Sequence, residues 1–183
     1  MHPGIYEPEK DSYLLSETIK EFLKNRNKRI KILDMGSGSG IQAKTCKELG
    51  FESITTADIN PEAISYLKKQ GFKSIKSDLF SKINKQMFDL IIFNPPYLPE
   101  DDLEPDDSKI ATTAGNQGYE LIVNFLKQAK FFLNKEGIIL LLFSSLSKPE
   151  IIKKQAKKLG YSLILLKKEK LFFEELYVYQ LKL

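Results

Sequence analysis

The 183-residue sequence contains one cysteine, one histidine and no tryptophan, and only two of its basic residues are arginines. A single cysteine, Cys46, excludes an intrachain disulfide framework, and with one histidine it excludes a zinc site of the usual cysteine–histidine kind. No serine–histidine–aspartate triad is available unless His2 reaches in from the terminus. The longest apolar run, residues 138–143, is far shorter than the ~20 residues of a membrane span.

Basic residues outnumber acidic ones only slightly, 28 against 24, which leaves a formal net charge of +4. Almost all of the basic residues are lysines, whereas arginine is the residue that contacts phosphates and bases in bidentate geometry. This balance is more typical of a solvated surface than of a nucleic-acid reader. The length and the 42% of hydrophobic residues are sufficient for one domain with a core, which we expect over residues 1–183. No basic segment followed by an apolar stretch opens the sequence, so we expect a cytoplasmic protein.

Segments with strand and helix patterns alternate along the chain, which predicts an α/β fold. The expected helices run from Asp11 or Ser12 to Leu23, from a glycine-rich turn to Leu49, and over 60–70, 121–132 and 149–159. The expected strands cover 30–35, 53–57, 72–76, 88–93, 137–143, 161–166 and 171–181. No helix separates the last two strands, so they should pair antiparallel. The prediction is a doubly wound, Rossmann-like, seven-stranded and mostly parallel sheet with an antiparallel C-terminal strand.

Some residues are expected to serve only the hydrophobic core. Cys46 lies on the apolar side of its helix pattern. The aromatic residues near the C-terminus are expected to fill the core of the last two strands rather than to form a stacking platform: Phe172, Phe173, Tyr177 and Tyr179.

A glycine-rich turn, Asp34–Gly40 (DMGSGSG), joins the first expected strand to a helix. Glycines allow a tight turn and let a ligand lie against the backbone. The spacing differs from the dinucleotide pattern G-x-G-x-x-G, because Ile41 takes the place of the third glycine. The carboxylate of Asp34 would repel a pyrophosphate, but it would suit a cationic amino-acid group.

Two more aspartates follow the next two expected strands. Asp58 lies about 20 residues after the glycines, the usual place of an acid that holds ribose hydroxyls. Asp78 can accept a hydrogen bond from an exocyclic amine. Each could serve alone as a helix cap, but ligands of doubly wound sheets bind beyond the carboxyl ends of the strands. Three carboxylates at successive strand ends, together with the glycine turn, predict S-adenosylmethionine, an adenosyl ligand with an amino-acid tail and no phosphate.

The tetrapeptide Asn94-Pro95-Pro96-Tyr97 follows the expected strand over 88–93. Prolines fix φ and remove backbone donors, so the carbonyls that precede them are left as acceptors. Asn94 adds a side-chain acceptor and Tyr97 a ring for stacking, which together suit a planar NH2 group. Such a nitrogen is a poor nucleophile, so catalysis by Asn94, Pro95, Pro96 and Tyr97 would consist of aligning it with a methyl group and stabilising its growing charge.

Five segments occur in the order found in HemK-like protein-glutamine methyltransferases: 6–12 (YEPEKDS), 33–40 (LDMGSGSG), 57–60 (ADIN), 77–79 (SDL) and 93–97 (FNPPY). The chain resembles in particular their short archaeal and eukaryotic branch, which methylates the glutamine of the GGQ motif in class 1 peptide chain release factors. The resemblance spans about residues 5–145, including 114–118 (AGNQG). It implies an S-adenosylmethionine-dependent protein-glutamine N-methyltransferase that acts in translation termination.

The resemblance also implies roles for individual residues, and we expect no metal site. Ser12, Asp34 and Gly36 would lie at the methionine end of the cofactor, and Asn94 to Tyr97 would take the glutamine amide. The implied cofactor-binding residues are Ser12, Asp34, Gly36, Ser37, Gly38, Asp58 (ribose), Ile59, Asp78 and Leu79 (both adenine), and Asn94.

The expected strand over 72–76 should form an edge of the sheet, and it carries Phe72 and Ile75. Exposed edges recruit strands from other chains, although Lys73 and Lys76 would discourage such pairing. Relatives in this branch pair with a small zinc-binding activator protein through this edge. The resemblance therefore implies an activator at Phe72–Lys76, besides the release factor as substrate.

Two other functions remain open at this stage. The same tetrapeptide suits enzymes that methylate adenine N6 or guanine N2 in RNA or DNA, because an exocyclic amine is also a planar NH2 group. Six acids within Glu100–Asp107 would repel a polyanion and attract a basic protein loop, so a nucleic-acid substrate is not expected. The second alternative is a non-catalytic S-adenosylmethionine-binding subunit, which would lose nothing on substitution of Asn94.

Overall fold

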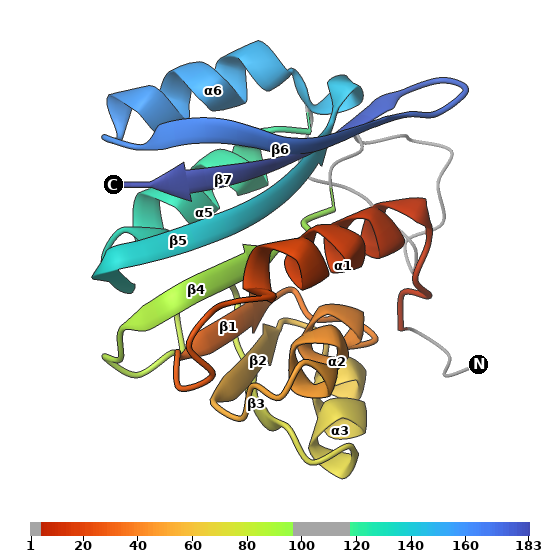
Figure 1. Ribbon diagram of the computed structural model, residues 1–183, viewed down its shortest axis with the longest axis vertical. Helices are drawn as coiled ribbons and strands as arrows, with labels where there is room; N and C mark the ends of the chain where they lie inside the picture. Colours follow the sequence, from red (N-terminus) through yellow and green to blue (C-terminus); the bar gives the residue numbers. More distant parts are fainter. Residues whose placement is uncertain (1–4, 97–117) are drawn as a thin grey trace.

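The computed structural model describes residues 5–96 and 118–183, and its strands form one sheet in the order β3-β2-β1-β4-β5-β7-β6 (Figure 1). The strands are β1 (Ile32–Met35), β2 (Ile54–Asp58), β3 (Lys73–Lys76), β4 (Phe88–Phe93), β5 (Leu133–Ser144), β6 (Ser162–Lys170) and β7 (Glu175–Lys182). The helices are α1 (Lys10–Leu23), α2 (Ile41–Glu48), α3 (Pro61–Lys69), α5 (Glu120–Ala129) and α6 (Pro149–Lys158), with a short 3-10 turn η1 (Ser145–Ser147).

The strand order reverses next to β1, which pairs in parallel with both β2 and β4. β5 continues the parallel part, whereas β7 runs antiparallel to both β5 and β6. The predicted doubly wound, seven-stranded sheet with an antiparallel C-terminal strand is therefore confirmed. A ligand of such a sheet binds outside the carboxyl ends of the strands, where the order reverses. This point lies at the ends of β1 and β4.

Helices cover both faces of the sheet: α1, α2 and α3 pack on one face, and α5 and α6 on the other (Figure 1). Side chains alternate between these layers, since Ile32 belongs to the core under α1 and Leu33 to the core under α5. A strand that is buried on both faces has a continuous apolar sequence. This burial explains why residues 138–143 of β5 are all apolar. Cys46 is fully buried, as expected.

Two helices begin at informative residues. Asn60 caps α3 by accepting a hydrogen bond from the Glu62 amide, and Pro61 occupies the first helical position, as the sequence predicts. Helix α1, however, begins at Lys10, so neither Asp11 nor Ser12 is its cap. The reason is that the Asp11 side chain is turned inward, where it accepts a hydrogen bond from the side chain of Asn94.

Several strand ends differ from the expectation, and contacts in the structure account for three of the differences. β3 begins only at Lys73, because the Phe72 amide donates to the Leu67 carbonyl and closes the end of α3. β5 begins at Leu133, where it already pairs with Phe88. The ladder between β6 and β7 closes with Lys170 opposite Glu175, so residues 171–174 form the turn between the two strands.

The position of that turn overturns one prediction about the core. Phe172 and Phe173 are 91% and 86% exposed, so they do not fill the core, because they lie beyond the last paired residues of the hairpin. They contact each other edge to face, with ring centroids 4.6 Å apart. Tyr177 and Tyr179 lie within β7 and do pack against the core under α5.

Among the helices of residues 5–96 and 118–183, none combines the length and apolarity needed to cross a membrane.

Candidate active site

Asp58, the last residue of β2, ties together two turns at the carboxyl edge of the sheet. Its Oδ2 accepts from the Gly38 amide at 2.7 Å, and its Oδ1 accepts from the Asn60 amide at 2.8 Å. Burial raises the pKa of Asp58, although these backbone N–H groups oppose the shift. Each carboxylate oxygen keeps a second lone pair, so the group can still accept a hydrogen bond from a ribose hydroxyl.

Asp34 lies at the end of β1 and is only 1% exposed. Its Oδ2 accepts from the Ala43 amide of α2 at 3.1 Å. Burial raises the pKa of Asp34 to about 7, and the neighbouring negative charge of Asp58 adds to this shift. A cationic group brought next to Asp34 would favour its charged form. The environment therefore fits the amino group of an amino-acid ligand.

The glycine turn leaves open space at Gly38. Its φ is +49°, and a Cβ added there would meet nothing nearer than the Cβ of Tyr6, at 4.0 Å. Gly36 is exposed, and an added Cβ there would lie 3.2 Å from the ring of Phe93. Ser37 is buried and its Oγ donates to the Ala57 carbonyl, so its side chain holds the turn against β2 rather than facing a ligand. The backbone of the turn offers the surface that a cofactor can contact.

A second turn, after β3, lies beside Asp58, because the Ser77 amide donates to the Asp58 carbonyl at 2.8 Å. In this turn Asp78 is exposed, whereas Leu79 is buried with a φ of +43°, a left-handed conformation that is uncommon for a residue other than glycine. The Ser77 hydroxyl donates to the Leu79 carbonyl at 2.7 Å and holds this conformation. Ile59, 53% exposed, follows Asp58 at the same edge.

Asn94 follows the carboxyl end of β4. Its Nδ2 donates to Asp11 Oδ2 at 2.9 Å and lies 3.4 Å from Ser12 Oγ. Its Oδ1 is buried and has no hydrogen-bond partner among residues 5–96 and 118–183. Pro95 is buried and Pro96 half-buried, whereas the predicted Tyr97 and the acidic segment Glu100–Asp107 lie outside the described residues. Buried acceptors are normally satisfied, so this unpartnered oxygen marks Asn94 as a candidate site residue.

The sequence pattern did not single out Tyr6 and Asp11 as site residues. Asp11 accepts from the Ser12 amide at 2.6 Å and from the Tyr6 hydroxyl at 3.4 Å. Burial raises the pKa of Tyr6, so its hydroxyl keeps its proton and can donate. Both residues belong to the segment 6–12 that carries the family resemblance, which is the one signal that pointed to them. Tyr6 contacts Asp11, which binds Asn94, so α1 is connected to the end of β4.

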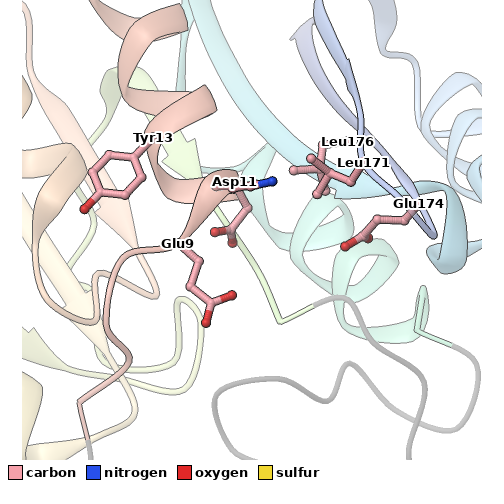
Figure 2. A pocket seen from close by; sticks show the side chains of 7 residues that line it. Glu9, Asp11, Tyr13, Leu171, Glu174 and Leu176 are labelled. Atoms are coloured by element: carbon pink, nitrogen blue, oxygen red, sulfur yellow. The ribbon is translucent and has the colours of Figure 1, made fainter.

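A cavity of about 420 Å³ adjoins this network on the side of Asp11. Figure 2 shows that Asp11 and Tyr13 of α1 and the preceding residue, Glu9, line one side, and that the β6–β7 hairpin contributes Leu171, Glu174 and Leu176. Within the described part of the chain, no group of histidine, cysteine, aspartate and glutamate side chains could hold a metal ion.

Comparison with known proteins identifies relatives over nearly the whole chain. A protein of Methanocaldococcus jannaschii, provisionally named a protein N5-glutamine methyltransferase, is 33% identical over 186 residues, which cover 97% of this chain and 91% of that protein. The release factor glutamine methyltransferase of Fusobacterium nucleatum is 35% identical over 113 residues, which cover 57% of this chain and only 32% of that longer protein.

The solved structure of the E. cuniculi Mtq2–Trm112 complex, described as responsible for methylation of the eRF1 translation termination factor, shares the fold with a TM-score of 0.78. At 24% identity, the match covers 98% of both chains. The sequence also matches the methyltransferase small domain family over residues 8–161. The chain therefore belongs to the methyltransferase small domain family, and it is an S-adenosylmethionine-dependent methyltransferase.

Proposed function

We propose that this enzyme methylates the side-chain amide nitrogen of a glutamine in a protein, and that this glutamine belongs to the GGQ motif of a class 1 peptide chain release factor. The observation that carries the proposal is the buried Oδ1 of Asn94, which has no partner within residues 5–96 and 118–183 and follows the strand paired with β1. A primary amide presents two N–H donors in one plane, which is the group that such an acceptor would complement. The names of the M. jannaschii and F. nucleatum relatives support the same substrate class.

The chain's own groups would act on the acceptor amide rather than on the cofactor. Asn94 Oδ1 accepts one amide hydrogen, and the backbone carbonyl that precedes Pro96 accepts the other. These two hydrogen bonds orient the nitrogen toward the methyl group, which S-adenosylmethionine supplies as an electrophile when bound. As the new N–C bond forms, the bond between the methyl group and sulfur would break and leave S-adenosylhomocysteine. The nitrogen would become positive, and the two acceptor oxygens would stabilise that charge before a proton leaves to water.

Methyl transfer from labelled S-adenosylmethionine tests the proposal directly. The purified enzyme is expected to label a class 1 release factor from the same source, and mass spectrometry of the GGQ peptide should locate one added methyl group on the glutamine. A release factor with this glutamine changed to alanine serves as the control and should stay unlabelled. Labelling of RNA or DNA oligonucleotides in place of the release factor would instead identify a nucleic-acid methyltransferase.

We propose that Asp58 contributes to cofactor affinity. Asp58→Ala is expected to weaken S-adenosylmethionine binding by about 1.5–3 kcal/mol, because it removes an ionised acceptor for the ribose hydroxyls. The substitution also removes the acceptor of the Gly38 amide, which holds the glycine turn. Titration calorimetry measures the affinity, and Asp58→Asn is the control because it keeps one acceptor oxygen. Equal affinity of Asp58→Ala and the unaltered enzyme would remove Asp58 from the site.

We also propose that β3 docks a small zinc-binding activator protein. β3 is an edge strand, and the related Mtq2 structure was solved together with Trm112. Phe72, expected to take part, is only 8% exposed and precedes the strand, so the accessible apolar side chain of β3 is the half-buried Ile75. Pairing would therefore rest on the free backbone groups of the edge, with Ile75 contributing the apolar contact.

Co-expression with the activator candidate from the same source, followed by size exclusion, tests this interface. Ile75→Lys is expected to reduce or abolish complex formation, because it adds a third positive charge between Lys73 and Lys76 at the edge. Ile164→Lys is the matched control, since Ile164 is 55% exposed on β6 at the opposite edge of the sheet. The proposal would be wrong if the unaltered chain stayed monomeric and fully active, or if both variants bound alike.

A further inference from the structure

We infer that Asp11 is a positioning residue for methyl transfer: it fixes the orientation of the Asn94 amide so that Oδ1, rather than Nδ2, faces the methyl acceptor. The inference rests on the proposed function in one respect, that the acceptor is an NH2 group. Its structural part, that a carboxylate on α1 decides which way the amide of Asn94 points, stands on the contacts between these two residues.

The orientation of an asparagine amide needs a determinant, because its oxygen and nitrogen have nearly the same shape but opposite hydrogen-bonding roles. With Oδ1 toward the substrate, Asn94 accepts a hydrogen from the acceptor amide. After a half-turn, its Nδ2 would present two donors to another donor, and neither group would be satisfied. Catalysis by Asn94 therefore requires that one of the two orientations be strongly favoured.

A carboxylate supplies this preference, because it can only accept hydrogen bonds. Asp11 Oδ2 lies 2.9 Å from Asn94 Nδ2, and the opposite orientation would bring two acceptor oxygens together. The other neighbour, Ser12 Oγ, lies at 3.4 Å and can donate as well as accept, so it does not discriminate between the orientations. Asp11 is thus the group among these contacts that distinguishes Oδ1 from Nδ2.

Asp11 is itself held in place. Its Oδ1 accepts from the Ser12 amide at 2.6 Å and from the Tyr6 hydroxyl at 3.4 Å, which leaves Oδ2 for Asn94. The side chain is only 4% exposed, although it borders the cavity in Figure 2, so little water competes for its oxygens. Helix α1 is anchored through the fully buried Leu15 and Ile19, which makes the carboxylate a rigid reference point.

The substitution Asp11→Asn separates positioning from packing, because it changes the hydrogen-bonding pattern but hardly the shape. The Ser12 amide would retain the remaining carbonyl oxygen at position 11, so the new NH2 group would face Asn94 and draw its Oδ1 away from the substrate. We expect kcat to fall about a hundredfold, with cofactor affinity and thermal stability close to those of the unaltered enzyme. Glu21→Gln is the control: it removes an exposed carboxylate from the other end of α1, away from the cavity, and should leave kcat unchanged.

A reversed pair provides the rescue that a purely structural role would not produce. Asn94→Asp alone places two carboxylates against each other without a donor, and its activity should be low. In the double variant Asp11→Asn/Asn94→Asp, the amide at position 11 can donate to the carboxylate at position 94, whose other oxygen again faces the substrate. We expect the double variant to exceed both single variants in kcat at least tenfold, about the effect of 1.4 kcal/mol. A double variant no better than the worse single one would overturn the inference.

The side-chain NH2 resonances of Asn94 give a readout that does not depend on the substrate. They can be assigned by their disappearance in Asn94→Ala. In the unaltered enzyme these protons should exchange slowly with solvent because one is bonded to Asp11, and in Asp11→Asn the exchange should accelerate. An enzyme that does not methylate the release factor but shows this change would refute the proposed substrate and keep the inference, whereas identical resonances in both proteins would overturn it.

Discussion

Asn94→Ala is expected to lower kcat for methyl transfer by about a hundredfold to a thousandfold, the usual effect of removing one group that stabilises transition-state charge. Asn94 Oδ1 is the buried side-chain acceptor without a partner in the described part of the chain, and its removal leaves the substrate amide without that hydrogen bond. Affinity for S-adenosylmethionine should change little, because Asp34, Asp58 and the glycine turn lie at other strand ends. Single-turnover kinetics and titration calorimetry measure the two quantities separately.

The control for this variant addresses the buried carboxylate of Asp11, which the substitution leaves without its hydrogen-bond donor. Without Asn94, Asp11 Oδ2 loses its donor, which costs about 1–3 kcal/mol of folding stability. Thermal unfolding of Asn94→Ala, compared with the double variant Asn94→Ala/Asp11→Ala, measures this loss and distinguishes it from the catalytic effect. Full turnover by Asn94→Ala on the true substrate would show that the NPPY segment does not hold the acceptor.

Gly40→Ala is expected to cause the largest loss of folding stability among substitutions in the glycine turn. Gly40 precedes α2 with a φ of +74°, and an added Cβ would lie 2.3 Å from a methyl carbon of Leu67. Leu67 is fully buried, so it cannot move aside without disturbing the core. Left-handed strain of about 1–2 kcal/mol and overpacking of about 1–3 kcal/mol should add.

Gly50→Ala is the matched control for Gly40→Ala. Gly50 has a similar φ of +85°, but an added Cβ there would meet nothing within 4 Å. The difference between the two variants in the free energy of unfolding, from denaturant titrations with equal slopes, therefore isolates the clash with Leu67. Equal losses at both positions would mean that Leu67 relaxes and that backbone strain alone accounts for the effect.

The fold could be predicted from the sequence because its signals are local. The apolar run of residues 138–143 is continuous since β5 is covered on both faces, and Asn60-Pro61 marks the start of α3 through cap chemistry that involves only neighbouring residues. The glycine turn and the NPPY segment are likewise contiguous. Their places at strand ends follow from the rule that parallel strands of a doubly wound sheet present their carboxyl ends on one side.

Tertiary structure alone decided how the site residues meet. Asp11 and Asn94 are separated by 83 positions, and no local pattern shows that a residue in the first turn of α1 is turned inward to bind the segment after β4. The bond from the Gly38 amide to Asp58, 20 positions further along the chain, likewise depends on the pairing of β1 with β2. The exposure of Phe172 and Phe173 follows from the register of the β6–β7 hairpin, which composition does not encode. The secondary-structure elements, the fold class and the candidate site residues can thus be predicted from the sequence. The orientation of each polar group, in contrast, depends on partners that only the folded chain brings within hydrogen-bonding distance.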